Sequence, residues 1–505
     1  MKFKRALVSV SDKTGLVDLL RPLVQEGLQV VSTGGTAQHL RSNGISCISV
    51  SEITEFPEVM GGRVKTLHPK IHMSLLARPI PEDTELLENF GLKMFDLVVC
   101  NLYPFEKVSA REGVREEELI EHIDIGGPTM LRAAAKNFSS VVVLCDPKDY
   151  LEFLENRKEI DLNHRKKWAS KVFQQTSKYD GMIAQRLQLE TESVLKIHAD
   201  RFKTLRYGEN AHQSATWFVG GSNSNGLHTS QIIQGKELSY NNLLDLEAAC
   251  SLVRLFKEPT TVAVKHNNPC GVSSHQIPLE SLKRAISSDS VSVFGGIIAL
   301  NSVLDFKMAQ VLHELFLECI IAPEITPEAQ ELFSKKKNLR VLIWPGINDF
   351  VPQSEIRSIS GGFLVQSADL NFGKIETWQS HENIIPDSIR EDMIFGEKIC
   401  SFLKSNAIAL VKDKTSVGLG MGQVNRIDAL EQAVQRWKKF HSNIQEPILV
   451  SDAFFPFTDT LELAHKNGIR WILQPGGSVR DEEVKLKAKE LGVGLIFSGV
   501  RHFKH

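Results

Sequence analysis

The run Arg5-Ala6-Leu7-Val8-Ser9-Val10, followed at once by Ser11-Asp12-Lys13-Thr14-Gly15, decides the fold class of this chain. Residues 5–10 are mostly apolar and predict a β-strand, whereas residues 16–26 have the spacing of an amphipathic helix that Gly27 ends. A strand that turns directly into a helix is the beginning of an α/β arrangement. The sequence that follows repeats this pattern.

The same alternation continues through the first part of the chain. Residues 28–31 predict a second strand, the turn 32–36 leads into a helix that stops near Gly44, and residues 45–50 predict a third strand. A later strand is expected at 97–100. Strands that alternate with helices favour a doubly wound, mainly parallel sheet wrapped by helices. Ligands of such sheets bind at the carboxyl ends of the strands, so functional residues are expected in the turns that follow them.

Length and charge limit the class of protein. At 505 residues the chain exceeds one ordinary core, so two or more domains are expected. The formal net charge of −2, from 59 basic and 61 acidic residues, argues against a nucleic-acid-binding protein, which would normally carry a basic excess. The balance leaves room for local cationic pockets that bind small anions.

Cysteine usage and the N-terminus point to a cytoplasmic location. The seven cysteines are far apart, odd in number and form no CxxC pair. They indicate neither a disulfide framework nor a zinc cluster, and they fit a reducing cytosol. The N-terminus has neither the apolar core nor the cleavage site of a signal peptide, and no run of about 18 apolar residues predicts a membrane span.

A change in residue composition and predicted secondary structure predicts the domain boundary. Residues 151–200 are rich in charge and helix formers and are interpreted as a helical connector, whereas the sequence from Arg201 onward has short strands, glycine pairs and Asn-rich turns. We expect two domains, 1–198 and 199–505. The second is large enough for two subdomains, although no clear sequence repeat is visible.

Two successive strand-to-helix turns carry small hydroxyl groups. Ser11 and Lys13 follow the first strand, and Ser32 and Gly35 follow the second. Each turn alone is more often an ordinary helix cap, but two in succession favour a phosphate site, because free backbone N–H groups and the helix dipole attract an anion. Neither turn is a Walker A loop or a GxGxxG motif, so ATP and dinucleotides are not implied.

A basic loop and two later turns complete the candidates of the first domain. The segment 61–70 carries Arg63, Lys65 and Thr66 after a glycine pair that favours close approach of a ligand. Further along, Tyr103 follows a strand and Asp124 precedes a helix that carries Lys136. A solvated loop, a packed aromatic and a helix cap are the plain structural alternatives.

The second domain contains the run Ala263-Val264-Lys265-His266-Asn267-Asn268-Pro269-Cys270-Gly271. Successive residues of a strand point to opposite faces, so Lys265 and His266 share one site only where Pro269 and Gly271 break the strand. A cation beside an imidazole is suited to proton transfer next to a developing negative charge. A solvated turn with a capping histidine is the alternative.

The second domain has further polar or glycine breaks next to apolar runs. The turn 418–426 ends in an arginine at the start of a helix and is suited to an anion. These breaks contain the candidate residues Arg206, Tyr207, Phe294, Gly295, Asn406, Arg426 and Phe503.

Taken together, the motifs resemble the family of bifunctional purine-biosynthesis enzymes AICAR formyltransferase/IMP cyclohydrolase, where AICAR is phosphoribosylaminoimidazolecarboxamide. The resemblance covers essentially the whole chain, and its most specific segments are GGRVKTLHPKIH, IDIGGPTMLRAAAKN, LRYGEN, KHNNPCG, FGGIIALN, SDAFFPF and QPGGS. It implies a methylglyoxal-synthase-like cyclohydrolase domain and a cytidine-deaminase-like transformylase domain of two subdomains without zinc. It also implies a homodimer whose transformylase site is built across the subunit interface.

The resemblance implies two reactions and assigns residues to them. First, 10-formyltetrahydrofolate, a co-substrate, donates a formyl group to the 5-amino group of AICAR; then formyl-AICAR closes its ring to IMP with loss of water. For formyl transfer it implies His266 as base, Lys265 as acid or electrostatic partner and Asn406 as donor to the formyl oxygen, with Arg206, Arg426 and Phe503 binding the nucleotide. For ring closure the implied catalytic residues are Lys65, Tyr103, Asp124 and Lys136, and the implied phosphate and ribose contacts are Ser11, Lys13, Ser32, Gly35, Arg63 and Thr66.

Departures and rivals are few. Ala211 stands where the family usually has proline, and Met421 where it often has alanine, which puts pocket shape in question but not the reaction. A zinc deaminase requires P-C-x-x-C, and Pro269-Cys270 lacks the second thiolate. No metal is therefore expected. A non-catalytic sensor of AICAR or IMP remains the alternative from another class.

Overall fold

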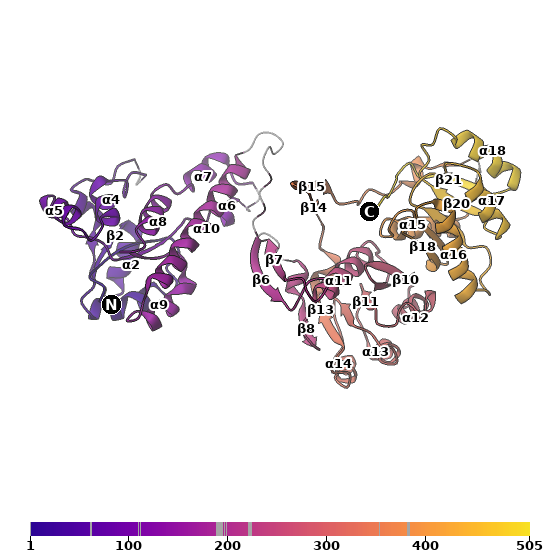
Figure 1. The fold of residues 1–505 in the computed structure, drawn as a ribbon, viewed down its shortest axis with the longest axis horizontal. Helices are drawn as coiled ribbons and strands as arrows, with labels where there is room; N and C mark the ends of the chain where they lie inside the picture. Colours follow the sequence, from indigo (N-terminus) through magenta and orange to yellow (C-terminus); the bar gives the residue numbers. More distant parts are fainter. Residues whose placement is uncertain are drawn as a thin grey trace. The chain divides into compact units, whose positions relative to one another are not determined.

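The computed structural model of the chain describes residues 2–60, 63–109, 111, 113–187, 195, 197, 199–220, 225–352, 354–380 and 384–505. The chain divides into two compact units, Met1–His198 and Ala199–His505 (Figure 1). We call them unit 1 and unit 2.

Unit 1 is built on one parallel sheet. Among its described residues the strand order is β3-β2-β1-β4-β5, and every neighbouring pair is parallel. The order reverses between β1 and β4, which is the topological switch point of a doubly wound sheet. The predicted fold class of this part is confirmed. The strands are β1 (Arg5–Val10), β2 (Gln29–Ser32), β3 (Ile48–Ser49), β4 (Leu97–Asn101) and β5 (Val142–Leu144).

The third predicted strand is much shorter than expected. Residues 45–50 were predicted as a strand, but β3 holds only Ile48–Ser49, and Val50 begins a helix. Ser49 caps this helix, and Glu52 completes a capping box with it. The reciprocal cap satisfies two N–H groups that a longer strand would leave to its neighbour, so local capping overrides the apolar strand pattern here.

Helices cover both faces of the sheet in unit 1. One face is packed by α1 and α9, and the other by α4, α8 and most of α10. The helices are α1 (Leu16–Gln25), α2 (Gly34–Ser42), α3 (Val50–Thr54), α4 (Pro69–Leu76), α5 (Pro81–Asn89), α6 (Phe105–Ser109), α7 (Glu116–Glu121), α8 (Gly126–Lys136), α9 (Tyr150–Asn156) and α10 (Leu162–Arg186).

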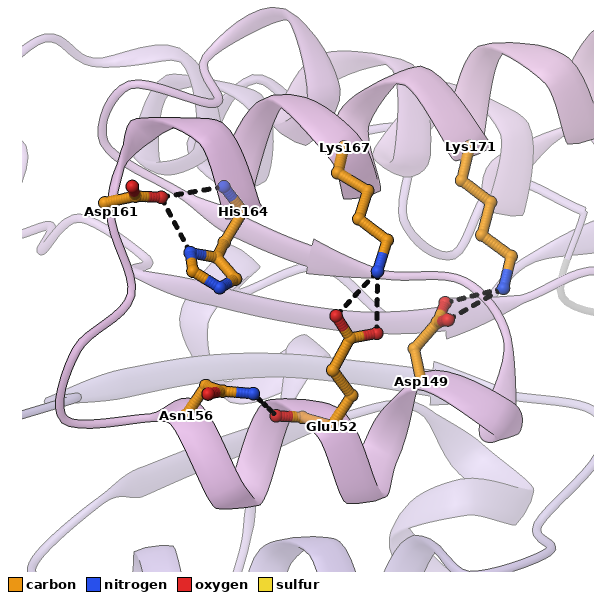
Figure 2. Close-up of polar contacts among 7 residues, drawn as sticks. All are labelled: Asp149, Glu152, Asn156, Asp161, His164, Lys167 and Lys171. Atoms are coloured by element: carbon orange, nitrogen blue, oxygen red, sulfur yellow. Dashed lines mark hydrogen bonds and ion pairs between the residues drawn. The ribbon is translucent and has the colours of Figure 1, made fainter.

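Helix α10 is part of unit 1 and not a connector. The expected helical connector over 151–200 is therefore wrong for this segment, because Trp168, Val172 and Tyr179 are buried in the two cores of the unit. Figure 2 shows how polar contacts also fix α10: Lys167 pairs with Glu152 of α9, and Lys171 pairs with Asp149 at 2.8 Å. A charged sequence with a narrow apolar stripe is typical of a helix that packs on one side only.

Unit 2 contains a large mixed sheet. Among its described residues the order is β16-β21-β20-β19-β17-β18-β10-β9-β11-β12-β13-β8. Its strands are β8 (Gln231–Gln234), β9 (Thr260–Lys265), β10 (Asn268–Ser274), β11 (Ile297–Leu300), β12 (Cys319–Ala322), β13 (Arg340–Ile343), β16 (Gln379–Ser380), β17 (Ile408–Lys412), β18 (Thr415–Gly420), β19 (Ile448–Ser451), β20 (Trp471–Gln474) and β21 (Gly494–Phe497). Two separate ribbons are formed by β6 (Ala199–Leu205) with β7 (Ala215–Gly220) and by β14 (Ser354–Ile359) with β15 (Gly362–Ser367).

The two halves of this sheet repeat one fold. Each half runs edge strand, helix, hairpin, helix, strand, helix, strand, helix, strand, with the same parallel and antiparallel pairings. The halves meet where β10 pairs with β18. The helices are α11 (Tyr240–Val253), α12 (Pro278–Ser288), α13 (Phe306–His313) and α14 (Pro327–Phe333) in the first half, and α15 (Asp387–Cys400), α16 (Arg426–Phe440), α17 (Asp459–Lys466) and α18 (Asp481–Leu491) in the second. The two subdomains expected in unit 2 therefore share one fold, which occurs twice.

Equivalent glycines support the repeat although the sequence shows none plainly. A Cβ at Gly271 of β10 would overlap the carbonyl oxygen of Ala285 in α12, and a Cβ at Gly418 of β18 would overlap that of Ala433 in α16. Each strand therefore accepts its helix only at a glycine. Helices α11 and α15 cover one face of the sheet in a shared core, and the remaining helices cover the other face. Within the described residues, no helix combines the length and apolar character that crossing a membrane demands.

Candidate functional site

The cavity of unit 1 lies at the switch point of its sheet. It has a volume of about 640 Å³ and opens at the carboxyl ends of β1, β2 and β4. Eight of the residues predicted from the sequence line it together: Ser11, Lys13, Gly35, Arg63, Lys65, Thr66, Tyr103 and Asp124. The remaining predicted residues of this unit are placed elsewhere, as described below.

Asn101 ties the floor of this cavity together. Its Oδ1 accepts the N–H groups of Ser11 at 2.7 Å and Asp12 at 2.9 Å, and its Nδ2 donates to the carbonyl of Asp12 at 2.8 Å. The side chain is 8% exposed. Three hydrogen bonds therefore hold the loop after β1 to the end of β4, which fixes the N–H groups that face the cavity.

The cationic wall of the cavity lies beside the N-terminus of α2. A Cβ at Gly34, the first residue of α2, would overlap Nζ of Lys65, so the ammonium group lies directly against this turn. Lys65 pairs with Glu58 at 2.8 Å, and Arg63 pairs with Glu121. The helix N-terminus carries a partial positive charge, as the lysine does. Because the two positive features lie together, this corner attracts an anion more strongly than either would alone.

Asp124 and Tyr103 form the titratable side of the cavity. Oδ1 of Asp124 accepts the N–H of Gly127 at 2.8 Å. Burial raises the pKa of Asp124, and the N–H groups of Gly127 and Tyr103 act in the opposite direction. Burial also raises the pKa of the Tyr103 phenol, and the charge of Asp124 raises it further. The shift brings the pKa of Asp124 closer to neutral pH, which suits proton transfer, whereas it keeps the Tyr103 phenol protonated as a hydrogen-bond donor.

Two predicted residues do not line this cavity. Ser32 is fully buried, and its hydroxyl donates to the carbonyl of Val8 at 2.8 Å, so it ties two strands together. Lys136 is the last residue of α8, ten positions from Gly126, which is about 15 Å along a helix. The glycine pair at 61–62 lies outside the described residues.

In unit 2, Lys265 and His266 are brought together by a tight turn between β9 and β10. His266 and Asn267 have φ angles of 53° and 61°, and Lys265 pairs with Asn268 across the turn. Two positive φ angles define the turn type that best matches twisted hairpin strands. Nζ of Lys265 donates to the carbonyl of Phe294 at 2.5 Å, next to Gly295. The strand does break after Lys265, but the predicted cause is wrong: Pro269 and Gly271 both lie within β10, and His266 and Asn267 form the turn.

A cavity of about 230 Å³ lies beside this turn. Lys265 and His266 line it from β9 and its turn, whereas Leu419 and Met421 line it from the end of β18. Oδ1 of Asn268, another lining residue, is buried without a hydrogen-bond partner. The cavity therefore offers an unused acceptor beside a base and a cation.

Asn406 lies at the same end of the sheet and is held from both sides. Its backbone N–H and its Nδ2 both donate to the carbonyl of Gln423, just beyond the end of β18. Its Oδ1 accepts from Arg426 at 2.7 Å. Arg426 is 7% exposed and also donates to Ser451 and Asp452, so in this arrangement its guanidinium orients Asn406. A direct contact of Arg426 with a nucleotide remains a prediction.

The other residues predicted for unit 2 lie on its surface. The guanidinium of Arg206 stacks over the ring of Tyr207, and Phe294 is exposed and contacts Phe316. Phe503 is 43% exposed, and Arg501 stacks on it. None of the four predicted side chains, Arg206, Tyr207, Phe294 and Phe503, lines the 230 Å³ cavity.

Comparison with known proteins decides which family this geometry belongs to. The profile of the AICARFT/IMPCHase bienzyme family matches residues 134–436, and that of the MGS-like domain matches residues 15–129. The bifunctional purine biosynthesis protein PurH of Leuconostoc mesenteroides is 44% identical over 99% of this chain and 100% of its own. The PurH proteins of Trichodesmium erythraeum and Persephonella marina are 45% and 44% identical, over 99% of this chain and 99% and 100% of their own.

The chain belongs to the AICARFT/IMPCHase bienzyme family. It is therefore a bifunctional enzyme of purine biosynthesis, with AICAR formyltransferase and IMP cyclohydrolase activities. The resemblance stated from the motifs is confirmed. These matches give no support to a sensor without catalysis.

Two side chains of this bienzyme that support its sites were missed at the level of sequence. The hydroxyl of Tyr179 donates to the carbonyl of His122 at 3.1 Å and accepts the N–H of Asp124 at 2.8 Å. Asp452 is fully buried and accepts from Arg426 and Ser405. Tyr179 lies in the segment interpreted as a connector, so no pattern connected it with a site, whereas Asp452 stands in the family motif SDAFFPF and is traceable from there.

The segment 501–505 of the bienzyme packs against the loop that carries Asn406. The backbone of Lys504 accepts from Ser405 and donates to its hydroxyl at 3.0 Å. His502 is 1% exposed and lies between Asp369 at 2.7 Å and Glu397 at 3.5 Å. Burial by itself lowers the pKa of His502, but the hydrogen bonds with these two carboxylates outweigh it and raise the pKa to about 9.

The charged form of His502 stabilises unit 2, and this stabilisation is lost at alkaline pH. The folded pKa is higher than the ordinary value of 6.5, so the stabilisation is complete below about pH 6.5 and is lost as the pH rises through about 9. We expect His502→Asn to remove up to about 3 kcal/mol at pH 6 and much less at pH 10. Urea unfolding at both pH values measures the difference. His441→Asn is the control: burial lowers the pKa of His441, so its removal should leave the alkaline loss unchanged.

Proposed function

We propose that unit 1, residues 1–198, carries the cyclohydrolase and that unit 2, residues 199–505, carries the formyltransferase. The observation that supports this division most strongly is that each unit has its own cavity with its own proton-transfer groups. Lys65, Tyr103 and Asp124 line one cavity, and Lys265 and His266 line the other. The cavity of unit 1 has the cationic corner that a nucleotide phosphate requires.

For formyl transfer we assign the proton transfer to the Lys265–Asn268 turn. The 5-amino group of AICAR attacks the formyl carbon of 10-formyltetrahydrofolate, and His266 takes the proton that the nitrogen loses. Lys265 stabilises the oxyanion and supplies a proton to the folate nitrogen that leaves. Asn406 has a second N–H on Nδ2 that its bond to Gln423 does not use, and this N–H donates to the formyl oxygen.

For ring closure the reacting groups are already in one molecule. The carboxamide nitrogen of formyl-AICAR attacks the formyl carbon, and the carbon–oxygen bond then breaks with loss of water. Orientation therefore supplies a large part of the rate. Lys65 stabilises the negative oxygen, while Asp124, assisted by Tyr103, passes to this oxygen the two protons that the nitrogens of formyl-AICAR lose, so that it leaves as water. No step requires a metal ion. Lys136 lies outside this cavity, and its assignment to ring closure rests on the motif alone.

We propose that the enzyme acts as a homodimer. Both strands of the β14–β15 ribbon are largely exposed, and Phe363, Leu364 and Val365 are 58%, 57% and 50% exposed. An isolated two-stranded ribbon is marginally stable in water, so apolar side chains on it favour a partner. A second copy is the partner that the family resemblance implies. We expect sedimentation to give twice the mass of the chain, and Phe363→Asp with Val365→Asp to give the single mass.

A cytoplasmic location fits the thiols of the enzyme. All seven cysteines are free, and five are buried. Burial raises the pKa of Cys270 and Cys319 to about 12, so these thiols are unreactive. Free, unreactive cysteines persist in a reducing compartment.

A single coupled assay tests the proposed function. Purified enzyme receives AICAR and 10-formyltetrahydrofolate, and tetrahydrofolate and IMP are followed separately. Wild type should form both. An enzyme that binds AICAR without forming either product would contradict the proposal and restore the sensor.

A further inference from the structure

The backbone of the Lys265–Asn268 turn is held in an unusual conformation. His266 and Asn267 both have positive φ angles, of 53° and 61°. Asparagine adopts this region readily, but a histidine does so at a cost. Such a conformation persists only where the surroundings enforce it. The direction of the imidazole therefore depends on whatever holds this turn.

Asp245 of α11 is the group that holds it. Its Oδ1 accepts the N–H of Asn267 at 2.6 Å, and the backbone of His266 lies near enough to lower the pKa of the same carboxylate. Burial raises the pKa of Asp245, while the backbone N–H of Asn267, the charge of His266 and the backbone of His266 lower it. The carboxylate therefore lies close enough to interact electrostatically with the imidazole, although it does not line the cavity.

The second half of the sheet contains an equivalent arrangement without catalytic groups. The turn between β17 and β18 has Asp413 and Lys414 at φ angles of 50°, and we call Lys412–Thr415 the twin turn. Asp392 of α15 accepts the N–H of Asp413 at 2.9 Å and that of Lys414 at 2.6 Å. A carboxylate beneath a tight turn is therefore a repeated feature of this fold.

The twin turn is remote from formyl transfer. It pairs with the far end of β10, where the N–H of Ser274 donates to the carbonyl of Lys414. The catalytic turn lies at the other end of the same strand, six residues away, which is about 20 Å along an antiparallel strand. The two turns therefore have the same supporting geometry and different surroundings.

We propose that Asp245 is a positioning residue for formyl transfer, which sets the direction of His266 and stabilises the imidazolium formed when His266 takes the amine proton. This inference rests on the proposed role of His266. Removing the carboxylate frees the N–H of Asn267 and lets the turn leave its strained conformation. A reacting group displaced by about 1 Å loses on the order of 10²-fold in rate.

The duplicated turn supplies the matched control. Asp245→Leu and Asp392→Leu each remove the same carboxylate from the same place in the repeat, and Asp245→Asn and Asp392→Asn each keep one acceptor oxygen. For all four variants, kcat and KM for AICAR in formyl transfer are measured together with the melting temperature. The leucine variants should show similar falls in melting temperature.

The kinetic results should separate the two positions. We expect Asp245→Leu to lower kcat about 10²-fold with KM changed less than about threefold, and Asp245→Asn to lie between it and wild type. Both Asp392 variants should stay within about twofold of the wild-type kcat.

Equal kcat values for the Asp245 and Asp392 variants would overturn the inference and leave Asp245 a structural cap. If Asp245→Leu does not fold, the comparison of the two asparagine variants decides. Absence of formyl transfer in wild type would instead contradict the proposed function itself.

Discussion

His266→Ala is expected to lower kcat for formyl transfer by about 10²–10⁴-fold and to leave ring closure of added formyl-AICAR unchanged. The 5-amino group of AICAR is a poor nucleophile, because its lone pair is drawn into the ring and towards the carboxamide. It reacts with the formyl carbon only as its proton is removed. The imidazole on the Lys265–Asn268 turn is the base that lines this cavity together with a lysine. Stopped assays of tetrahydrofolate and IMP, with each substrate supplied separately, measure the two activities.

Asp413→Ala is the matched control for this variant. Asp413 occupies the place of His266 in the twin turn, is also exposed and has a φ of 50° against 53°. Alanine therefore meets the same backbone strain at both positions, and only the lost side chain differs. Asp413→Ala should keep formyl transfer within about twofold of wild type. A comparable fall in both variants would mean that the turn, and not the imidazole, limits the reaction.

The sequence predicted the sheet of unit 1 well because its signals are local. Residues 5–10 and 28–31 are apolar runs bounded by turn residues, and both form strands where expected. Residues 45–50 carry the same apolar signal, but the capping box of Ser49 and Glu52 starts a helix there. Helix α10 was misplaced for a different reason. Its buried stripe is narrow, and only contact with β5 and α8 shows that it belongs to the sheet.

The repeat in unit 2 could not be predicted from the sequence. The two halves keep the turn geometry, the carboxylate beneath each turn and a glycine at each helix contact, but other equivalent positions carry different side chains. His266 is replaced by Asp413 and Asn268 by Thr415 at equivalent places. Backbone conformation constrains a few positions in each half, whereas the remaining positions need only stay apolar or polar. Equivalence is therefore visible in strand order and not in sequence.

The sequence predicted those site residues that lie in the loops directly after strands. Lys65, Tyr103 and Asp124 come from three loops that parallel strands bring to one edge, which the alternation of strand and helix predicts. Ser32 satisfies the same pattern, but its side chain points into the sheet. The direction of a side chain at a strand end depends on the last few φ and ψ angles, and the sequence does not specify them.

Lys65→Ala is expected to lower the rate of ring closure by about 10²–10³-fold while formyl transfer continues, so that formyl-AICAR accumulates. The ammonium group lies against the first turn of α2 in a cavity that also holds Asp124. In this cavity, Lys65 is the lysine to which we assign stabilisation of the negative oxygen of the tetrahedral intermediate. Chromatography of the reaction products, with AICAR and 10-formyltetrahydrofolate as substrates, measures the accumulated intermediate.

Lys70→Ala separates this effect from the loss of a surface ion pair. Lys70 pairs with Glu55 at 2.7 Å and Lys65 pairs with Glu58 at 2.8 Å, and the two lysine side chains are 23% and 22% exposed. Lys70 does not line the cavity. Partly exposed pairs of this kind contribute at most about 1 kcal/mol, so Lys70→Ala should change neither activity by more than about twofold. If Lys70→Ala also accumulated formyl-AICAR, the loop and its carboxylates would govern ring closure, and Lys65 would lose its place as the group that stabilises the intermediate.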